Sequence, residues 1–216
     1  MQQPKDKIRK LILKNAKDEF IDKGFSKSSM REVARKTGTT VSNLYTYFKN
    51  KDALFLAVVS PVVSVIESQF TNIKTNSLHT DPYYWKFEWH QIMITNVINF
   101  IDKHRELLNL LAFKSHGSSI ENYKDDLIER YTDIWTAHTD KIQAQFPNIK
   151  ADHSSFFIHN IASFLFNSIT EFLMHQATKE QMLKYSQEIM TFMFYGYEGL
   201  YEYDFETMTE KPRQKR

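Results

Sequence analysis

What this chain of 216 residues lacks constrains it more than what it contains. It has no cysteine, five glycines and five prolines. The absence of cysteine excludes disulfide frameworks and thiolate metal sites. Because glycine and proline are the residues that most often interrupt helices, their scarcity predicts an all-α fold. The alternation of apolar and polar residues that is typical of strands is also missing.

Long apolar stretches are also missing. No window reaches the roughly 18 uninterrupted apolar residues that indicate a membrane-spanning helix. The apolar run at residues 11–13 is too short, and its surroundings too charged, for a signal peptide. We therefore expect a soluble cytoplasmic protein with no membrane partner.

The common catalytic and cofactor motifs do not occur either. The eight histidines are scattered and form no His-Glu-x-x-His pattern, and Glu171 with His175 offers only two possible ligands one helical turn apart. There is no glycine-rich phosphate loop, nucleophile elbow or dinucleotide fingerprint. We expect no metal, no cofactor and no catalytic residues.

The charge is divided unevenly along the chain. Residues 1–51 carry 13 Lys or Arg against 5 Asp or Glu, whereas residues 52–216 carry 15 against 21. A net charge of +2 for the whole chain hides this asymmetry. A cluster of cations in one segment indicates a polyanionic partner such as DNA, although the same lysines and arginines can also be a solvated helix face.

Residues 24–54 hold the most specific pattern, which predicts two short helices around a tight turn. Ser29 and Glu32 have the spacing of a capping box, in which each side chain satisfies a free backbone N–H. Gly38 can end this helix in the left-handed conformation, and Thr40 can cap the next one. Such a helix-turn-helix in a basic segment predicts binding to double-stranded DNA. The side chains expected on its buried side are Val33, Ala34, Leu44 and Phe48.

The second of these helices is expected to be the recognition helix. In the major groove, Asn43 can hydrogen-bond adenine bidentately, Val41 can touch a thymine methyl group, and Ser42 can bond to more than one base. Thr39, just outside the helix, can reach a base or a phosphate. The predicted DNA-binding set, including phosphate contacts, is Ser29, Thr39, Thr40, Val41, Ser42, Asn43, Tyr45, Tyr47 and Lys51. Tyr45 has an alternative role, in which its ring packs against the first helix.

The run from Thr40 to Leu54, TVSNLYTYFKNKDAL, resembles the TetR/AcrR family of one-component bacterial transcription regulators. In that family a capped recognition helix is followed by Leu-Tyr-x-Tyr/His-Phe-x-x-Lys-x-x-Leu, which this chain matches. The resemblance covers about residues 5–55, and the remainder resembles the family only in length and helical character. Family members often have Gly and Thr where this chain has Ser42 and Asn43, which implies a different operator.

The resemblance implies a domain organisation. It implies a three-helix helix-turn-helix domain at residues 1–51 and a larger helical domain for effector binding and dimerisation at 52–210. Residues 211–216 are a basic tail that we expect to be disordered. Repression is the family's usual output, and activation remains open. The expected helices, about nine in all with the two of the helix-turn-helix, cover about residues 5–23, 51–75, 82–103, 105–115, 119–146, 152–176 and 179–203. Pro61 is expected to kink the helix at 51–75, either as a route for the signal or as a tolerated irregularity.

The last two expected helices are apolar on more than one side. A helix with two apolar sides is buried on two sides. In the TetR-like family these helices pair with their copies in a homodimer, and a two-fold dimer matches a palindromic operator. The predicted interface residues are Phe156, Phe157, Phe164, Met190, Phe194, Tyr197 and Tyr201. The alternative is that these side chains fill the core of a monomer.

The middle of the chain is rich in aromatic residues, which suits a pocket for a small lipophilic or aromatic effector. The predicted ligand-binding residues are Trp85, Trp89, His90, Met93, Phe113, His116, Tyr131, Trp135, Phe164 and Asn167. The alternative is that most of these rings belong to an ordinary core.

Three functional hypotheses follow. The first is a ligand-responsive, DNA-binding repressor. The second is an all-helical enzyme, or a lipid or small-molecule carrier, whose basic N-terminal part is incidental. The third is a regulator that senses no small molecule or that responds to a partner protein. Specific binding to duplex DNA separates the first from the second.

Overall fold

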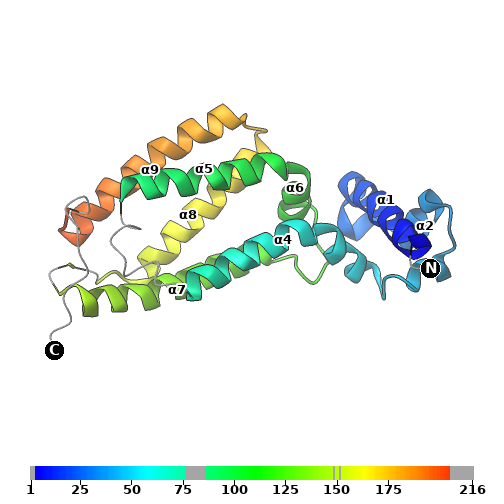
Figure 1. Ribbon diagram of the computed structural model, residues 1–216, viewed down its shortest axis with the longest axis horizontal. Coiled ribbons are helices and arrows are strands. Elements are labelled where there is room, and N and C mark those ends of the chain that lie inside the picture. The colour runs from blue at the N-terminus through cyan, green and yellow to red at the C-terminus, as the bar shows by residue number, and fades with distance from the viewer. Residues whose placement is uncertain (1–2, 76–85, 148, 151, 205–216) are drawn as a thin grey trace. The chain divides into compact units, whose positions relative to one another are not determined.

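The computed structural model describes residues 3–75, 86–147, 149–150 and 152–204, and all regular structure in these ranges is helical (Figure 1). Its helices are α1 (Gln3–Lys27), α2 (Met30–Thr37), α3 (Val41–Tyr45), α4 (Lys51–Thr75), α5 (Phe87–Lys103), α6 (Arg105–Phe113), α7 (Tyr123–Gln145), α8 (Ser155–Met174) and α9 (Lys179–Tyr201). The predicted all-α fold is confirmed.

Most helix ends lie within a few residues of their predicted positions. Gly24 interrupts α1 with φ 72° and ψ 170°, at the place where the sequence predicts the first helix to end. Contrary to the prediction of a start near residue 119, α7 begins at Tyr123, because residues 118–122 form turns. The predicted cap at residues 81–82 lies outside the described residues.

The chain divides into two compact units. Unit 1 comprises residues 1–67 and 104–123, and unit 2 comprises residues 68–103 and 124–216. The helix α4 therefore contributes residues to both units. The predicted functional boundary near residue 51 stays a prediction, because compactness alone does not locate a functional border.

The core of unit 1 is built around three phenylalanine rings. Phe20 and Phe55 are in edge-to-face contact at 5.1 Å between ring centroids, and Phe25 lies 5.2 Å from Phe55. Ile12 and Leu44 are also fully buried in this unit. Because α1 packs against both α2 and α6, this core fixes the short helices of the N-terminal part.

One helix in the described part of the chain, over Lys51–Ile73, is long and apolar enough to cross a membrane by length and composition. Pro61 lies inside α4, and the helix continues through it. Leu54, Phe55 and Val62 on α4 are buried in unit 1. A helix that packs in the core of a folded domain is apolar because its side chains are buried there, so an apolar composition alone does not indicate a membrane span.

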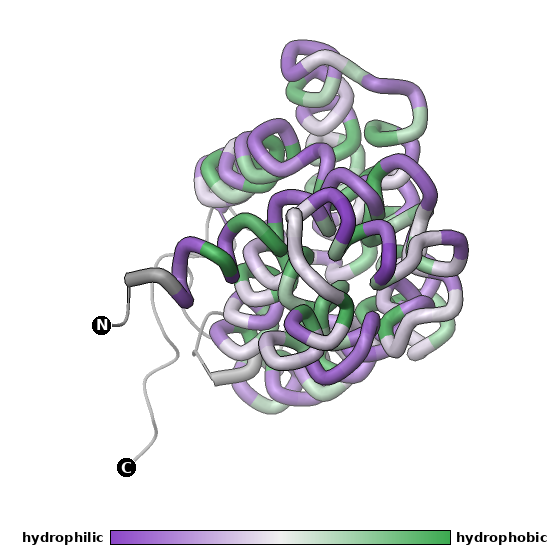
Figure 2. The backbone as a smooth tube through the Cα atoms, turned by 90° about the vertical axis from the view of Figure 1, so that its right-hand side faces the viewer, coloured by the Kyte–Doolittle hydropathy of each residue, from purple (hydrophilic) through white to green (hydrophobic). Residues whose placement is uncertain are grey.

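In unit 2, α5 packs along α9, and a buried cluster links α9 to the end of α7. The cluster contains Ile142, Ile149, Phe194 and Tyr201. Apolar and polar stretches alternate along the backbone of the helices (Figure 2), as amphipathic helices require.

Candidate nucleic-acid interface

The helix α2 is capped by Ser29 and ends at Gly38, as its sequence predicts. The Ser29 hydroxyl accepts a hydrogen bond from the Glu32 backbone N–H at 3.1 Å. The Glu32 carboxylate does not complete the predicted box but accepts two hydrogen bonds from Arg35, at 3.0 and 3.1 Å. Gly38 ends the helix in the left-handed region, with φ 70°. Ser29 is therefore a cap of α2, and its role at DNA stays a prediction.

The helix α3 is a single short turn that starts at its cap, Thr40. The Thr40 hydroxyl accepts from the Asn43 backbone N–H at 3.1 Å. Leu44 of α3 is fully buried, and Phe48, which follows the helix, is also buried. The Arg9 guanidinium lies 5.3 Å from the centroid of the Phe48 ring, so α1 braces the segment that follows α3.

The predicted base-reading residues differ in exposure. Ser42 is exposed, whereas Val41 and Asn43 are half-buried. Tyr45 is 48% exposed, which leaves its phenol available to a ligand. Tyr47 is half-buried and follows the end of α3. The structure thus brings Val41, Ser42 and Asn43 together on one turn of helix, in unit 1 with the basic α1.

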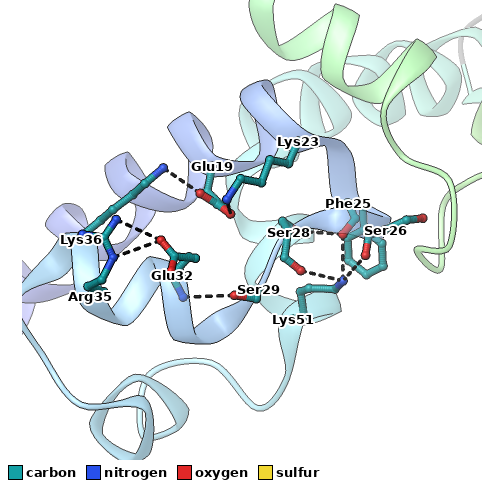
Figure 3. Close-up of polar contacts among 10 residues, drawn as sticks. All are labelled: Glu19, Lys23, Phe25, Ser26, Ser28, Ser29, Glu32, Arg35, Lys36 and Lys51. Atoms are coloured by element: carbon teal, nitrogen blue, oxygen red, sulfur yellow. Dashed lines mark hydrogen bonds and ion pairs between the residues drawn. The ribbon is translucent and has the colours of Figure 1, made fainter.

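Lys51 lies at the start of α4, and its ammonium group is engaged within the protein (Figure 3). It donates to the backbone carbonyls of Phe25 at 2.8 Å, Ser28 at 3.2 Å and Ser26 at 3.4 Å. It also lies 4.3 Å from the centroid of the Phe25 ring. The group ties the start of α4 to the corner between α1 and α2, so any phosphate contact of Lys51 would compete with these interactions.

We expect Lys51→Met to lower the free energy of unfolding by about 2 kcal/mol, because it removes hydrogen bonds from a charged donor. For a chain of this size the melting temperature should fall by roughly 4–8 °C. Differential scanning calorimetry measures this, with the exposed neighbour in Lys49→Met as the matched control. A different result would instead assign Lys51 to a phosphate contact. In that case the stability stays unchanged, and the slope of log affinity for DNA against log salt concentration falls by about one unit.

A buried carboxylate, which the sequence did not single out, joins α1 to α2 (Figure 3). Glu19 is fully buried, and its two oxygens pair with Lys36 of α2 at 2.7 Å and with Lys23 at 2.9 Å. Burial alone would raise the pKa of Glu19, but the hydrogen bonds from the two lysines outweigh burial and hold it below its ordinary value. Its signal in the sequence is an acidic residue in the apolar stripe of the first helix, seven residues after Ile12.

The segment after α6 is attached to the ends of α1 and α4. The Phe25 backbone N–H donates to the Lys114 carbonyl at 2.8 Å. Ser119 donates twice to the Asp52 carboxylate, from its backbone N–H at 2.7 Å and from its hydroxyl at 2.8 Å. Ser119 is thus hydrogen-bonded to Asp52 of α4, which explains why it does not cap the start of α7.

Two predicted ligand-binding residues, Phe113 and His116, belong to unit 1. The His116 side chain is 91% exposed and pairs with Glu121 at 2.9 Å. Phe113 is also exposed. The other predicted ligand-binding residues that the structure describes belong to unit 2.

The predicted ligand residues of unit 2 form two aromatic groups. In the first, Tyr131 and Trp135 of α7 are in contact at 5.7 Å between ring centroids. Burial raises the pKa of the Tyr131 phenol, which stays protonated. In the second, Trp89 meets His90 at 5.2 Å, and burial lowers the pKa of His90. Met93 is half-buried on the same helix, α5.

The remaining predicted ligand residues are Phe164, Asn167 and Trp85. Phe164 is exposed on α8. Asn167 is also exposed there, and its side-chain oxygen accepts from the Lys124 ammonium at 3.1 Å. Trp85 lies outside the described residues.

The predicted interface residues on α8 and α9 divide into buried and exposed sets. Met190, Phe194 and Tyr201 are buried within unit 2 and offer little surface to a partner. Phe157 and Tyr197 are half-buried in mutual contact at 6.4 Å, whereas Phe156 and Phe164 are exposed. The sequence did not distinguish these sets, because α8 and α9 each carry apolar residues on more than one side.

A different set of residues forms the exposed apolar face of α9. Phe192 is 75% exposed and Tyr195 is 62% exposed, and Leu200 is also exposed. Gly196 and Gly199 lie between them, and a Cβ added at either glycine would meet no other atom within 4 Å. Positions three and four residues apart share one side of a helix. The face therefore combines large apolar side chains with two positions where another helix can approach closely.

Comparison with known proteins agrees with this geometry. Residues 12–58 match the family model described as bacterial regulatory proteins, tetR family. The uncharacterized HTH-type transcriptional regulator YdgC of Bacillus subtilis is 26% identical over 106 residues, which are 49% of this chain and 53% of YdgC. The chain thus spans about half the length of the curated relatives it matches.

Solved structures of similar fold cover most of the chain. FadR from Bacillus subtilis, in complex with stearoyl-CoA, superposes with a TM-score of 0.58 at 14% identity, over 86% of this chain and 97% of FadR. NalD, the secondary repressor of the MexAB-OprM multidrug efflux pump in Pseudomonas aeruginosa, superposes with a TM-score of 0.58 at 20% identity, over 88% of this chain and 96% of NalD. The helix-turn-helix of this chain is therefore similar to that of the tetR family of bacterial regulatory proteins, and the chain shares its fold with solved transcription regulators.

Proposed function

We propose that the chain is a homodimeric transcription regulator that binds a palindromic operator through α3 and is released from it by a small lipophilic or aromatic effector. The observation that carries the proposal is the capped turn Val41–Tyr45, with Ser42 and Tyr45 exposed. It lies in unit 1 with the basic residues of α1, which supply the charge that phosphates attract. Similarity to transcription regulators supports a soluble cytoplasmic protein.

The dimer is supported by the exposed apolar face of α9. Monomeric proteins rarely leave large apolar side chains grouped on one helix face, and such faces mark interaction sites. A second copy of the same face is a natural occupant, because a two-fold axis makes one surface serve both partners. Two recognition helices related by this axis would meet half-sites about one turn of DNA apart.

The effector class is supported by the aromatic groups of unit 2, around Tyr131 and Trp135 on α7 and around Trp89 and His90 on α5. A lipophilic effector is also supported by FadR, a protein of similar fold that was solved in complex with stearoyl-CoA. Repression is the output proposed. An effector shifts the regulator only through its different affinity for two conformations, and a coupling of about 1–3 kcal/mol would change operator affinity roughly 5- to 150-fold.

The enzymatic alternative is disfavoured because the proteins matched here are transcription regulators. A small-molecule carrier without sequence-specific DNA binding is separated from a regulator by experiment. Purified protein is incubated with a pool of genomic duplexes, and bound fragments are sequenced at several salt concentrations. We expect enrichment of a palindromic site. Enrichment of no site, even after the protein is unfolded and refolded to remove bound ligand, would contradict the proposal.

A second experiment tests the effector class with the complex of the protein and its selected operator. Long-chain acyl-CoA esters and planar aromatic compounds are added separately to the complex, and the fraction bound is followed by fluorescence anisotropy. We expect one class to release DNA. If neither class does so, the proposed effector class is wrong, while the regulator assignment rests on the operator alone.

We expect Asn43→Ala to lose discrimination at one operator base pair in each half-site, by about 1–3 kcal/mol. The reason is that Asn43 lies in the first turn of α3, where a carboxamide can reach a base edge. Competition between operator variants measures the loss, and Lys10→Ala, at an exposed position of α1, serves as a control that weakens all duplexes alike. Intact discrimination in Asn43→Ala would show that α3 docks differently.

A further inference from the structure

Asn43 is held in place by three threonines. Its backbone N–H donates to the Thr40 hydroxyl at 3.1 Å, and its carbonyl accepts from the Thr46 hydroxyl at 2.7 Å. Its side-chain Nδ2 donates to Thr39 Oγ1 at 2.7 Å. The residue expected to read a base is thus fixed in both backbone and side chain before any DNA is bound.

Thr39 is itself well anchored. It lies between Gly38, which ends α2, and Thr40, which caps α3, and its backbone N–H donates to the Ala34 carbonyl at 3.0 Å. Its side chain is half-buried. Thr39 is therefore a rigid support for the Asn43 carboxamide rather than a free group at the protein surface.

The orientation of a carboxamide decides which base it can read. Its oxygen accepts and its nitrogen donates, and a half-turn of the side chain exchanges the two. Thr39 uses one N–H of Asn43 and leaves the other N–H and the oxygen. One donor and one acceptor match the N7 and N6 groups of adenine, whereas guanine presents two acceptors at the same edge.

We propose that Thr39 determines base preference without touching the base, by holding the Asn43 carboxamide in the orientation that selects adenine. The inference rests on the proposed function, since it assigns a specificity role within the same DNA site. Thr39 is a positioning residue in this account, and Asn43 is the residue that contacts the base.

The test compares variants on the selected operator and on its versions changed at the base pair that Asn43→Ala identifies. Thr39→Val keeps the side-chain shape and removes the hydroxyl. We expect it to lower discrimination at that base pair about 2- to 10-fold, the effect of one hydrogen bond, with affinity for the other changed duplexes unaltered. Thr39→Ser should retain the discrimination of the wild type. The double variant Thr39→Val/Asn43→Ala should match Asn43→Ala alone.

Three results would overturn the proposal. Equal weakening of all duplexes by Thr39→Val would mean a phosphate contact. A further loss caused by Thr39→Val in the Asn43→Ala background would mean a direct base contact. Unchanged discrimination in Thr39→Val would mean no role at all. A wild-type chain with no sequence preference would instead contradict the proposed function.

A measurement without DNA tests the same contact independently. In the free wild-type protein, NMR should show slower solvent exchange of the Asn43 carboxamide protons than of those of Asn50. Asn50 is a matched reference, because it caps α4 through its oxygen, which accepts from the Ala53 N–H at 2.7 Å. The difference should disappear in Thr39→Val, and equal exchange in the wild type would overturn the proposed tether.

Discussion

Phe192→Asp is expected to convert the dimer into monomers and to lower operator affinity roughly 10²- to 10⁴-fold. Phe192 is 75% exposed on the α9 face that carries Gly196 and Gly199, so the free monomer loses little when it is replaced. In the dimer, the aspartate would place two like charges near the two-fold axis and leave them desolvated. The loss of affinity follows from bivalency, because each head binds its half-site more readily when its partner is already bound.

Analytical ultracentrifugation and operator titration measure the two effects on the same samples. Ile92→Asp is the matched control, since Ile92 is an exposed apolar residue of unit 2 on α5 rather than α9. The control should stay dimeric. A dimeric Phe192→Asp with wild-type operator affinity would show that α9 does not form the interface, and the regulator assignment would then require another dimer surface.

Glu19→Gln is expected to lower the free energy of unfolding by roughly 3 kcal/mol at neutral pH, the lower end of the cost of breaking a buried ion pair. The lower end applies because Lys23 and Lys36 are partly exposed and can turn to solvent when the carboxylate is lost. Denaturant titration measures the change. Glu106→Gln is the control, because its pair with Lys17 at 2.5 Å is exposed and should contribute less than about 1 kcal/mol.

The Glu19 network also predicts a pH dependence. The pKa of Glu19 in the folded chain lies below its ordinary value of 4.5, so its stabilising contribution is complete above that value. The contribution is lost as the pH falls from 4.5 through the lower pKa of the folded state. The stability difference between wild type and Glu19→Gln should therefore shrink over that acid range. A difference that stays constant down to pH 3 would contradict the assigned ion pairs.

Much of the fold could be predicted because the residues that start and end its helices act locally. Gly24 and Gly38 have positive φ values where helices were expected to end, and Thr40 caps α3 as expected. Such signals depend on a few neighbouring residues. The start of α7 could not be predicted in the same way, because Ser119 is bound by Asp52, 67 residues earlier in the chain.

The sequence predicts the recognition turn, which the structure contains as α3, whereas the contacts of its residues with DNA stay a prediction. The recognition turn is visible in the sequence, yet the Lys51 ammonium is used by three backbone carbonyls that only the fold brings near it. The proposed dimer face on α9 shows the same limit. Met190 and Phe194 are buried whereas Phe192 and Tyr195 are exposed, and a helix with apolar residues on more than one side does not reveal which side meets its own core.

The central claim is that two copies of α3 read one operator, and a hydroxyl-radical footprint on a selected duplex tests it most directly. The account predicts two protected patches related by two-fold symmetry, with centres about one helical turn apart. Asn43→Ala should keep this pattern on the operator while losing preference at one base pair of each patch. A single unsymmetrical patch, or salt-sensitive protection without any preferred position, would contradict it.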